Sequence, residues 1–207
     1  KDAAVATIAK GRAATQMPAF EGKLSGDAIK ALVDYVYQPL AGVPNWGQAE
    51  IEASRVVTSP APPLARPVFA ADPMNLFVVV EAGDHHVTVL DGDTFTPLTR
   101  FASRFALHGG PKFSPDGRFV YFMSRDGWVT KYDLWRLETV AEVRPALNAR
   151  NIAMSKDGRH LAVANYLPHT LVILSAEDLS VERIFAVADR QGQSSRVSAV
   201  YQNPVRN

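Results

Sequence analysis

The sequence has 207 residues, of which 47% are hydrophobic and 21% charged, and its formal net charge is +1. This length and composition are typical of one large or two modest globular domains. The near-neutral charge argues against a nucleic-acid or membrane-surface binder, no apolar run is long enough for a membrane span, and the lack of cysteine excludes disulfides and thiol chemistry within this stretch.

The first 40 residues are predicted to be helical. An alanine-rich stretch, Ala3 to Lys10, ends at Gly11, and Ser25 is a candidate N-cap for a second helix with its body at 28–37. The second helix carries apolar residues at i, i+3, i+4 and i+7, which predicts one apolar stripe. These residues are Ile29, Leu32, Val33 and Val36.

Residues 42–67 are predicted to be a linker between two domains. Proline and glycine are frequent there, and Ser59-Pro60-Ala61-Pro62-Pro63 favours an extended chain. Within this linker, residues 51–58 are predicted to form one short strand.

From residue 68 the chain repeats a turn followed by an apolar strand. The aspartates of this turn, Asp72, Asp116 and Asp157, are 44 and 41 residues apart. Asp-Gly at the second and third turns favours a tight reversal, and a period of about 40–45 residues with several short strands indicates propeller blades. The strand after each turn is almost wholly apolar, so we predict it to be the inner strand of its blade.

Residues 68–207 hold about three blades, whereas a propeller has about four to eight. We therefore expect a mostly β fold: a partial β-propeller preceded by the C-terminal part, residues 1–41, of an all-α domain. We also expect the sequence to be a piece of a longer protein, cut at both ends.

Met17 lies in a loop just before the second predicted helix, in the pattern Met17-Pro18-Ala19-Phe20. A methionine in this setting either fills an apolar gap or provides the thioether ligand of a c-type haem iron. The position before an amphipathic helix favours the ligand. The Cys-x-x-Cys-His attachment site would then precede Lys1.

His108 precedes the second blade in the sequence His108-Gly109-Gly110-Pro111. Strand starts of this kind face the central channel of a propeller, and the two glycines let a bulky group approach the backbone. A lone histidine is usually structural, but a neutral imidazole is also a good iron ligand if its other ring nitrogen has an acceptor.

Several arginines are predicted near the same channel mouth. Guanidinium groups pair with carboxylates through two hydrogen bonds, so such arginines suit a ligand that carries carboxylates, although surface salt bridges are the alternative. Tyr166 is predicted on the corresponding edge of the third blade, where packing is the alternative role. The candidate arginines are Arg104, Arg125, Arg150 and Arg196.

The remaining histidines are predicted to be solvated. His85 and His86 fall in a turn between strands, and His160 and His169 are interpreted in the same way. No phosphate-binding loop and no serine-hydrolase or zinc-protease motif is present.

Taken together, these motifs resemble the cytochrome cd1 family. The similarity spans nearly the whole chain and is most specific over residues 101–135, including Phe113-Ser114-Pro115-Asp116-Gly117-Arg118 and Tyr132-Asp133-Leu134-Trp135. Proteins of this family join a c-type haem domain to an eight-bladed propeller that holds haem d1.

The resemblance implies a role for each candidate residue. Met17 would be the distal ligand of haem c, and His108 the proximal ligand of the haem d1 iron. Arg125 and Arg150 would pair with the carboxylates of haem d1, and Tyr166 would line the same pocket. Arg104 and Arg196 are weaker candidates for the same pairing.

Two activities occur in this family, and the resemblance favours one of them. One branch reduces nitrite to nitric oxide. The other oxidises dihydro-haem d1 in the last step of haem d1 maturation and passes the electrons to its own haem c. Residues 108–122 and 196–201 are more similar to the dehydrogenase branch. Tyr201-Gln202-Asn203-Pro204 stands where nitrite reductases have His-x-His-Pro, whose histidines supply the acid that nitrite reduction needs.

The expected function is therefore that of a haem d1-binding oxidoreductase of the periplasm. Its expected partners are haem d1 or its precursor as substrate, electron-carrier proteins, and a cytochrome cd1 nitrite reductase that receives the product. Nitrite reduction, and a non-catalytic cytochrome–propeller protein for electron transfer, are the alternatives. The catalytic base is not identified and is expected beyond Asn207.

Overall fold

The computed structural model describes residues 1–13, 15, 17–39, 42, 44–58, 64–203 and 205. The chain divides into two compact units, Lys1–Asn45 and Trp46–Asn207. The proline-rich motif at 59–63 and Pro204 lie outside the described residues. No helix in the described part of the chain is long and apolar enough to cross a membrane.

The first unit contains two helices, α1 (Asp2–Lys10) and α2 (Gly26–Val36). The predicted N-cap is confirmed, because the Ser25 hydroxyl accepts a hydrogen bond from the Ala28 N–H at 3.2 Å. Gly11 ends α1 at φ 67°, a left-handed conformation that favours glycine.

The predicted apolar stripe of α2 is only half buried. Ile29 and Val33 are 3% and 2% exposed, whereas Leu32 and Val36 are 44% and 72% exposed. Among the described residues of this unit, α2 packs on α1, and this contact covers one side of the stripe. Of the predicted apolar stripe, Ile29 and Val33 are therefore buried and Leu32 and Val36 are exposed.

The strand predicted at 51–58 is also wrong. Residues Gln48–Ser54 form helix α3, and only Val56–Val57 form a strand, β1, which pairs with β8. The Glu50 carboxylate accepts the Gly47 N–H at 2.8 Å and caps the helix, and Ile51 is 1% exposed. Residues 46–58 of the predicted linker therefore belong to the second unit. The predicted domain bounds, 1–41, 42–67 and 68–207, stay a prediction.

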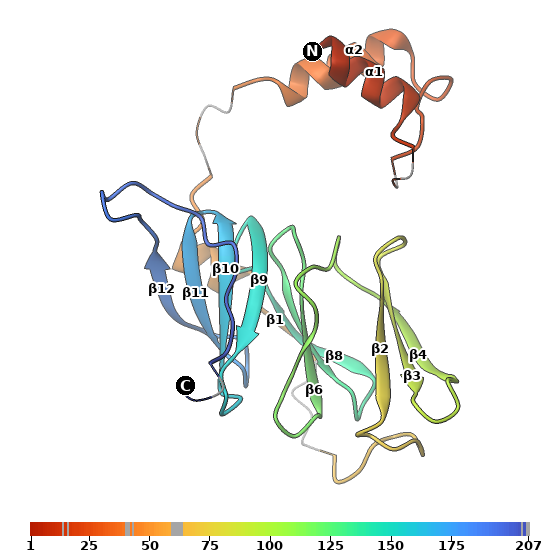
Figure 1. Ribbon diagram of the computed structural model, residues 1–207, viewed down its shortest axis with the longest axis vertical. Coiled ribbons are helices and arrows are strands. Elements are labelled where there is room, and N and C mark those ends of the chain that lie inside the picture. Colours follow the sequence, from red (N-terminus) through yellow and green to blue (C-terminus); the bar gives the residue numbers. More distant parts are fainter. Residues whose placement is uncertain are drawn as a thin grey trace. The chain divides into compact units, whose positions relative to one another are not determined.

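The second unit contains three antiparallel sheets that stand side by side (Figure 1). This confirms the mostly β prediction. The first sheet is β2 (Leu76–Glu81), β3 (His86–Asp91) and β4 (Pro97–Ala102). The second sheet has the order β1, β8 (Glu138–Val143), β7 (Val129–Asp133), β6 (Phe119–Met123) and β5 (Lys112–Phe113). The third has the order β12 (Val181–Ala186), β11 (Thr170–Ser175), β10 (His160–Leu167) and β9 (Asn148–Met154).

The strand that follows each Asp-Gly turn is not the edge strand of its sheet. In the second and third sheets this strand is β6 or β10, and it has a neighbour on both sides. The strands before the turn, β5 and β9, are the edge strands instead. The predicted inner strand is therefore one strand too late in the second and third sheets, because an apolar composition indicates burial of both sheet faces and not the position of a strand in its sheet. In the first sheet the strand after the turn, β2, is an edge strand, as predicted.

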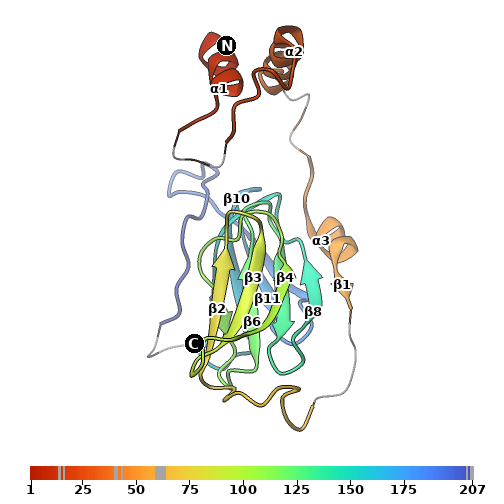
Figure 2. The same ribbon diagram turned by 90° about the vertical axis from the view of Figure 1, so that its right-hand side faces the viewer.

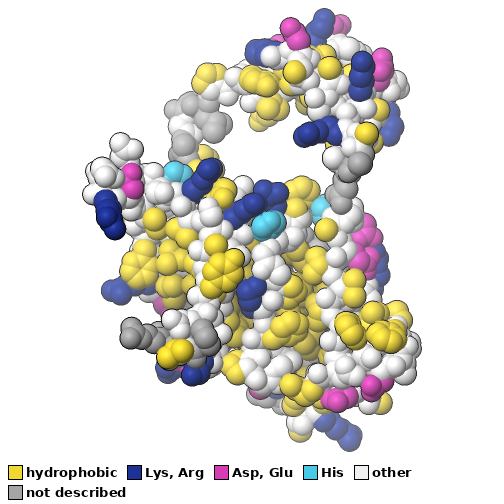
Figure 3. Space-filling model, in the orientation of Figure 1, with side chains coloured by type: hydrophobic (Ala, Val, Ile, Leu, Met, Phe, Trp, Pro, Cys, Tyr) yellow, Lys and Arg dark blue, Asp and Glu magenta, His cyan; other side chains and the backbone are white. Residues whose placement is uncertain are grey.

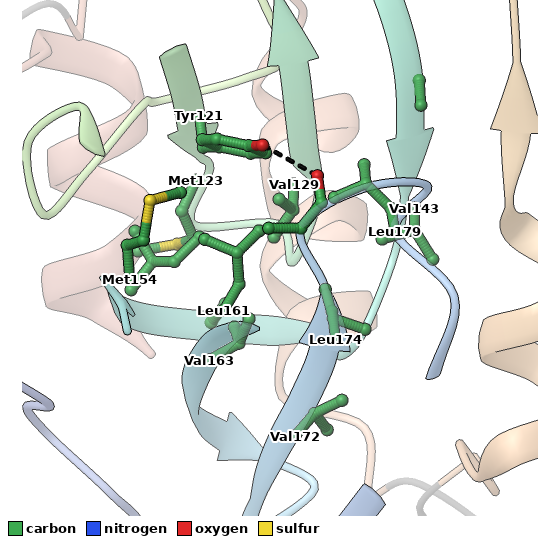
Figure 4. Packing of buried hydrophobic residues seen from close by; sticks show 14 of the residues in the cluster. Tyr121, Met123, Val129, Val143, Met154, Leu161, Val163, Val172, Leu174 and Leu179 are labelled. Carbon is green, nitrogen blue, oxygen red and sulfur yellow. Dashed lines mark hydrogen bonds between the residues drawn. The ribbon is translucent and has the colours of Figure 1, made fainter. Parts of the chain in front are cut away.

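The second sheet lies between the first and third sheets (Figure 1), which stand one behind another in the view of Figure 2, and an apolar cluster packs on each of its faces. One apolar cluster joins it to the first sheet and includes Val87, Val120 and Tyr132. A larger cluster joins it to the third sheet, where the Tyr121 hydroxyl donates to the Ala176 carbonyl at 2.7 Å (Figure 4). Every residue of β7 is buried, whereas β2 and β12 alternate with more exposed positions.

The turns between strands are held by one repeated hydrogen-bond pattern. The Asp116 and Asp157 carboxylates accept the N–H of Arg118 and Arg159, both at 3.1 Å. The Ser155 hydroxyl donates to Asp157 at 2.6 Å, and this bond, together with the Arg159 contacts, lowers the pKa of Asp157. The polar residues of the Ser-x-Asp-Gly motif are therefore satisfied locally.

One motif of the family resemblance has a structural role, namely Tyr132-Asp133-Leu134-Trp135. Asp133 is 1% exposed and accepts a hydrogen bond from Arg118 Nη2 at 2.7 Å and from the Trp135 N–H at 2.9 Å. A buried carboxylate needs such partners. This ion pair ties the turn before β6 to the end of β7.

Replacing Gly127 with alanine should destabilise the second unit strongly. Gly127 has φ 93°, and an added Cβ would lie 1.7 Å from the Ala146 carbonyl oxygen. Gly192→Ala is a matched control, because Gly192 also has positive φ, 81°, but no atom of the residues that the structure describes lies within 4 Å of its Cβ position.

We expect Gly192→Ala to lower the free energy of unfolding by about 1–2 kcal/mol from backbone strain, and Gly127→Ala by at least ~2 kcal/mol more from the clash. Urea unfolding of the full-length variants measures both. Equal losses for the two variants would contradict the close approach at Gly127.

Candidate functional site

The candidate residues of the second unit lie at one end of its three sheets. The turns β2–β3, β6–β7 and β10–β11 lie at this end, as do the starts of the strands β5 and β9. Figure 3 shows basic side chains and histidines along the upper end of these sheets. Because successive strands are antiparallel, residues far apart in the sequence meet here.

His108 is fixed between the second and third sheets. Its N–H donates to the Met123 carbonyl at 2.8 Å, and its Nδ1 lies 3.0 Å from the Arg150 carbonyl oxygen. A carbonyl can only accept, so Nδ1 carries the proton and Nε2 keeps a free lone pair. This arrangement supplies the acceptor that an iron-ligating histidine requires.

A cavity of about 290 Å³ adjoins His108. It lies between apolar residues of the first and second sheets and the two glycines that follow His108, which have φ 81° and 70°. Its lining residues are Val80, Leu107, His108, Gly109, Gly110, Pro111, Phe122 and Met123.

Arg150, Tyr166 and Arg196 form a second group beside His108. The guanidinium carbon of Arg150 lies 5.5 Å from the centre of the Tyr166 ring, and that of Arg196 lies 4.9 Å from it. The Arg150 Nη1 is buried and has no hydrogen-bond partner among the described residues. An unpaired buried donor is costly, so this nitrogen is well suited to an anionic oxygen of a ligand.

Tyr166 owes its orientation to an irregularity in β10. The pairing with β9 shifts between Asn165 and Leu167, so Tyr166 is left out of the ladder. Bulges of this kind re-aim side chains and are frequent near functional sites. The Tyr166 hydroxyl then lies 3.0 Å from Ser198 Oγ.

The pKa of Tyr166 lies below that of an ordinary tyrosine. The hydrogen bond with Ser198 lowers the pKa of Tyr166, burial opposes this, and the positive charges of Arg150 and Arg196 lower it further. The group formed by Arg150, Tyr166 and Arg196 is therefore cationic and arranged to hold negative charge.

Arg125 and Arg104 differ in whether the guanidinium is free to bind a ligand. The exposed Arg125 donates its backbone N–H to the Ala106 carbonyl at 3.1 Å, close to His108, and its guanidinium has no partner in the described part of the chain. Arg104 forms two hydrogen bonds with Glu142, which raise its pKa, and lies 3.9 Å above the Trp128 ring. Its predicted role as a carboxylate ligand stays a prediction, but its guanidinium is already engaged.

Met17 belongs to the first unit and is half-buried in the loop after α1. Its carbonyl accepts the Arg12 N–H at 3.1 Å, and its N–H donates to Thr15 Oγ1 at 3.2 Å. An added Cβ on Gly11 would lie 2.6 Å from that carbonyl oxygen, so Gly11 permits the tight loop. The backbone of the predicted ligand is thus well held.

The structure agrees only in part with the prediction that the other histidines are solvated. His85 is half-buried and makes contacts that the prediction did not include: its Nδ1 accepts the Ala106 N–H at 3.3 Å, and its ring lies 4.8 Å from that of Phe105. The prediction missed this contact because it depends on two different sheets. His160 contacts Glu182 and His169 contacts Ser194, through Nδ1 at 2.7 and 2.8 Å.

Three further residues at this site were not predicted. Ser198 holds Tyr166, and Asn151 Oδ1 accepts the Val200 N–H at 3.3 Å, which keeps residues 196–200 against β9. Lys112 contacts the glycines after His108. Serine, asparagine and lysine are common on surfaces, so no signal in the sequence distinguishes these three.

The family of the chain follows from its second unit. The family model for the Cytochrome D1 heme domain matches residues 71–207. The chain belongs to the cytochrome D1 heme domain family. All of the site residues from His108 to Arg196 lie inside the matched region.

Among curated proteins, the chain is 60% identical over 201 residues to the Dihydro-heme d1 dehydrogenase of Pseudomonas aeruginosa, which covers 97% of this chain and 41% of that protein. It is 33% identical over 122 residues to the Nitrite reductase of Stutzerimonas stutzeri, which covers 56% of this chain and 21% of that protein. The chain thus spans less than half the length of these relatives.

Among solved structures, the chain is similar to the dihydro-heme d1 dehydrogenase NirN in complex with DHE, with a TM-score of 0.85 and 59% identity, over 99% of this chain and 44% of that chain. The hydrazine synthase of Kuenenia stuttgartiensis has a TM-score of 0.52 at 19% identity, over 62% of this chain and 36% of that chain, and so shares the fold alone.

The titration of Tyr166 in this cytochrome D1 domain should depend on Ser198. Because the hydrogen bond with Ser198 is the largest cause that lowers the Tyr166 pKa, Ser198→Ala should raise that pKa toward the ordinary tyrosine value. The ultraviolet difference between each protein and its Tyr166→Phe counterpart isolates this one phenol during an alkaline titration.

Ser194→Ala is the control, since Ser194 contacts His169 and not Tyr166. This variant should leave the midpoint unchanged. An unchanged midpoint in Ser198→Ala would show that the hydrogen bond does not stabilise the phenolate.

Proposed function

We propose that this chain is part of a dihydro-haem d1 dehydrogenase, an oxidoreductase that acts in the last step of haem d1 maturation. The observation that carries the proposal is the His108–Arg150 pair: the Arg150 carbonyl holds the imidazole in one tautomer, and the buried Nη1 of the same arginine has no hydrogen-bond partner among the described residues. Identity of 60% to a dihydro-heme d1 dehydrogenase supports the choice of activity.

The residues present fit a tetrapyrrole that carries iron and carboxylates. His108 would hold the iron through Nε2. Arg150 and Arg196 would bind carboxylates of the substrate, with Tyr166 between them, and Arg125 is a further donor for the same purpose. Arginine suits this task because its planar fork matches a carboxylate and stays charged.

The bound dihydro-haem d1 supplies the iron and a saturated side chain, which must lose two electrons and two protons to become the unsaturated side chain of haem d1. This chain's residues position that substrate. The apolar cavity wall beside His108 keeps water from part of the site, and Arg150 and Arg196 fix its orientation. The base that takes the substrate proton is not assigned to any residue of this chain.

The electrons are proposed to leave through haem c, and Met17 is the proposed ligand of that iron. Helices α1 and α2 would then be the C-terminal part of a cytochrome c domain, and the three sheets would be blades of an eight-bladed propeller. The backbone contacts that hold Met17 support its role.

A periplasmic location is part of this proposal, as are electron-carrier proteins as partners. Transfer of the product to a cytochrome cd1 nitrite reductase would follow from the reaction. The resemblance to the cytochrome cd1 family supports these three points.

Nitrite reduction is the weaker alternative. Tyr201, Gln202 and Asn203 occupy the positions where the nitrite reductases are expected to have their acidic histidines. The similarity to the Nitrite reductase also covers less of this chain, 56%, than the similarity to the dehydrogenase, 97%.

His108→Ala should abolish the absorption change that haem d1 shows on binding to the full-length protein, because the iron loses its proximal ligand. His160→Ala is the matched control. His160 lines a different cavity and contacts Glu182, so this variant should bind haem d1 with an unchanged spectrum.

A wild-type spectrum in His108→Ala would refute the assignment of His108 as the iron ligand.

Incubation of the full-length protein with dihydro-haem d1 or with nitrite then distinguishes the two activities. Formation of haem d1 is the expected result. Steady reduction of nitrite would contradict the dehydrogenase, and binding of haem d1 without either reaction would support the non-catalytic electron-transfer protein.

A further inference from the structure

Lys112 forms hydrogen bonds with the loop that carries His108. Its Nζ donates to the Gly109 carbonyl at 2.8 Å and to the Gly110 carbonyl at 3.0 Å. The side chain is half-buried, and burial lowers the pKa of Lys112. The ammonium therefore satisfies two backbone acceptors in a place where water has limited access.

The loop needs such a contact because of its two glycines. Both have positive φ and no side chain to restrict them. His108 itself is anchored before them, through Met123 and Arg150. Lys112 closes the loop on the other side, where β5 begins.

The lysine is not required by the repeat. When the second and third repeats are aligned on Asp116 and Asp157, the positions of His108 and Lys112 are taken by Ala149 and Ala153. Both alanines are buried in β9, which forms without a histidine or a lysine at these places. The histidine and the lysine thus occur together in one repeat and are both replaced by alanine in the next.

We propose that Lys112 is a positioning residue for His108 and sets how firmly His108 holds the iron of haem d1, an inference that rests on the function proposed above. Its two hydrogen bonds hold the Gly109–Gly110 backbone, and that backbone fixes the direction of the imidazole. Its positive charge beside the ligand loop also favours the reduced, less positive iron.

The test compares Lys112→Met, Lys112→Arg and Lys156→Met in the full-length protein. Methionine keeps the length of the lysine chain but loses the donors and the charge, and arginine keeps both. Lys156→Met is the control, because Lys156 is an exposed lysine of the turn between β9 and β10. Each protein is titrated with haem d1, its visible and EPR spectra are compared, and the reduction potential of the bound iron is measured.

We expect Lys112→Met to bind haem d1 roughly tenfold more weakly, the effect typical of residues that hold a metal ligand in place. Its signature of histidine-ligated iron should be reduced and its potential lowered. Lys112→Arg should restore most of both, and Lys156→Met should match the wild type. Circular dichroism checks folding, and Lys112→Gln, which keeps one amide donor, replaces Lys112→Met if that variant does not fold.

Wild-type affinity, spectra and potential in the folded Lys112→Met variant would overturn the proposal, and so would a wild-type potential in Lys112→Gln, which has lost the charge. Equal losses in the methionine and arginine variants would also overturn it, since they would indicate a packing role. Failure of the wild-type protein to bind haem d1 would instead contradict the proposed function itself.

Discussion

The second unit depends on burial of the second sheet between its two neighbours. All of β7 and most of β6 are buried, which is possible only when both faces of the sheet are covered. Apolar clusters on either side provide that cover. Burial of apolar side chains is the main favourable contribution to folding, and here it also sets the distance and the order of the three sheets.

This stacking creates the candidate site. His108 stands at the start of the second sheet, and the carbonyl that fixes its tautomer belongs to Arg150 in the third sheet. Tyr166 is aimed by a bulge in β10 and held by Ser198, which lies beyond β12. No single sheet contains the site, so the chemistry is coupled directly to the packing of one sheet against the next.

Within the site, most polar groups have partners, and the exceptions are informative. The Arg104 guanidinium is engaged by Glu142, whereas the buried Nη1 of Arg150 has no partner among the described residues. The Nη1 of Arg150 therefore marks where an anionic group of a ligand fits. Lys112 is the opposite case, because its ammonium donates two hydrogen bonds to the loop that follows the proposed metal ligand.

The sequence by itself determined the local and periodic features. Ser25 caps its helix, the Ser-x-Asp-Gly turns recur with the repeat, and His108-Gly109-Gly110 marks the site, because each of these depends on residues that are close along the chain. The tertiary structure alone decided the rest. The positions of β5 and β9 at sheet edges depend on how strands pair within a sheet. The contact of His85 with Ala106 and the hydrogen bonds of Arg104 with Glu142 depend on how neighbouring sheets pack. Contacts between sheets join residues dozens of positions apart, and no local pattern specifies them.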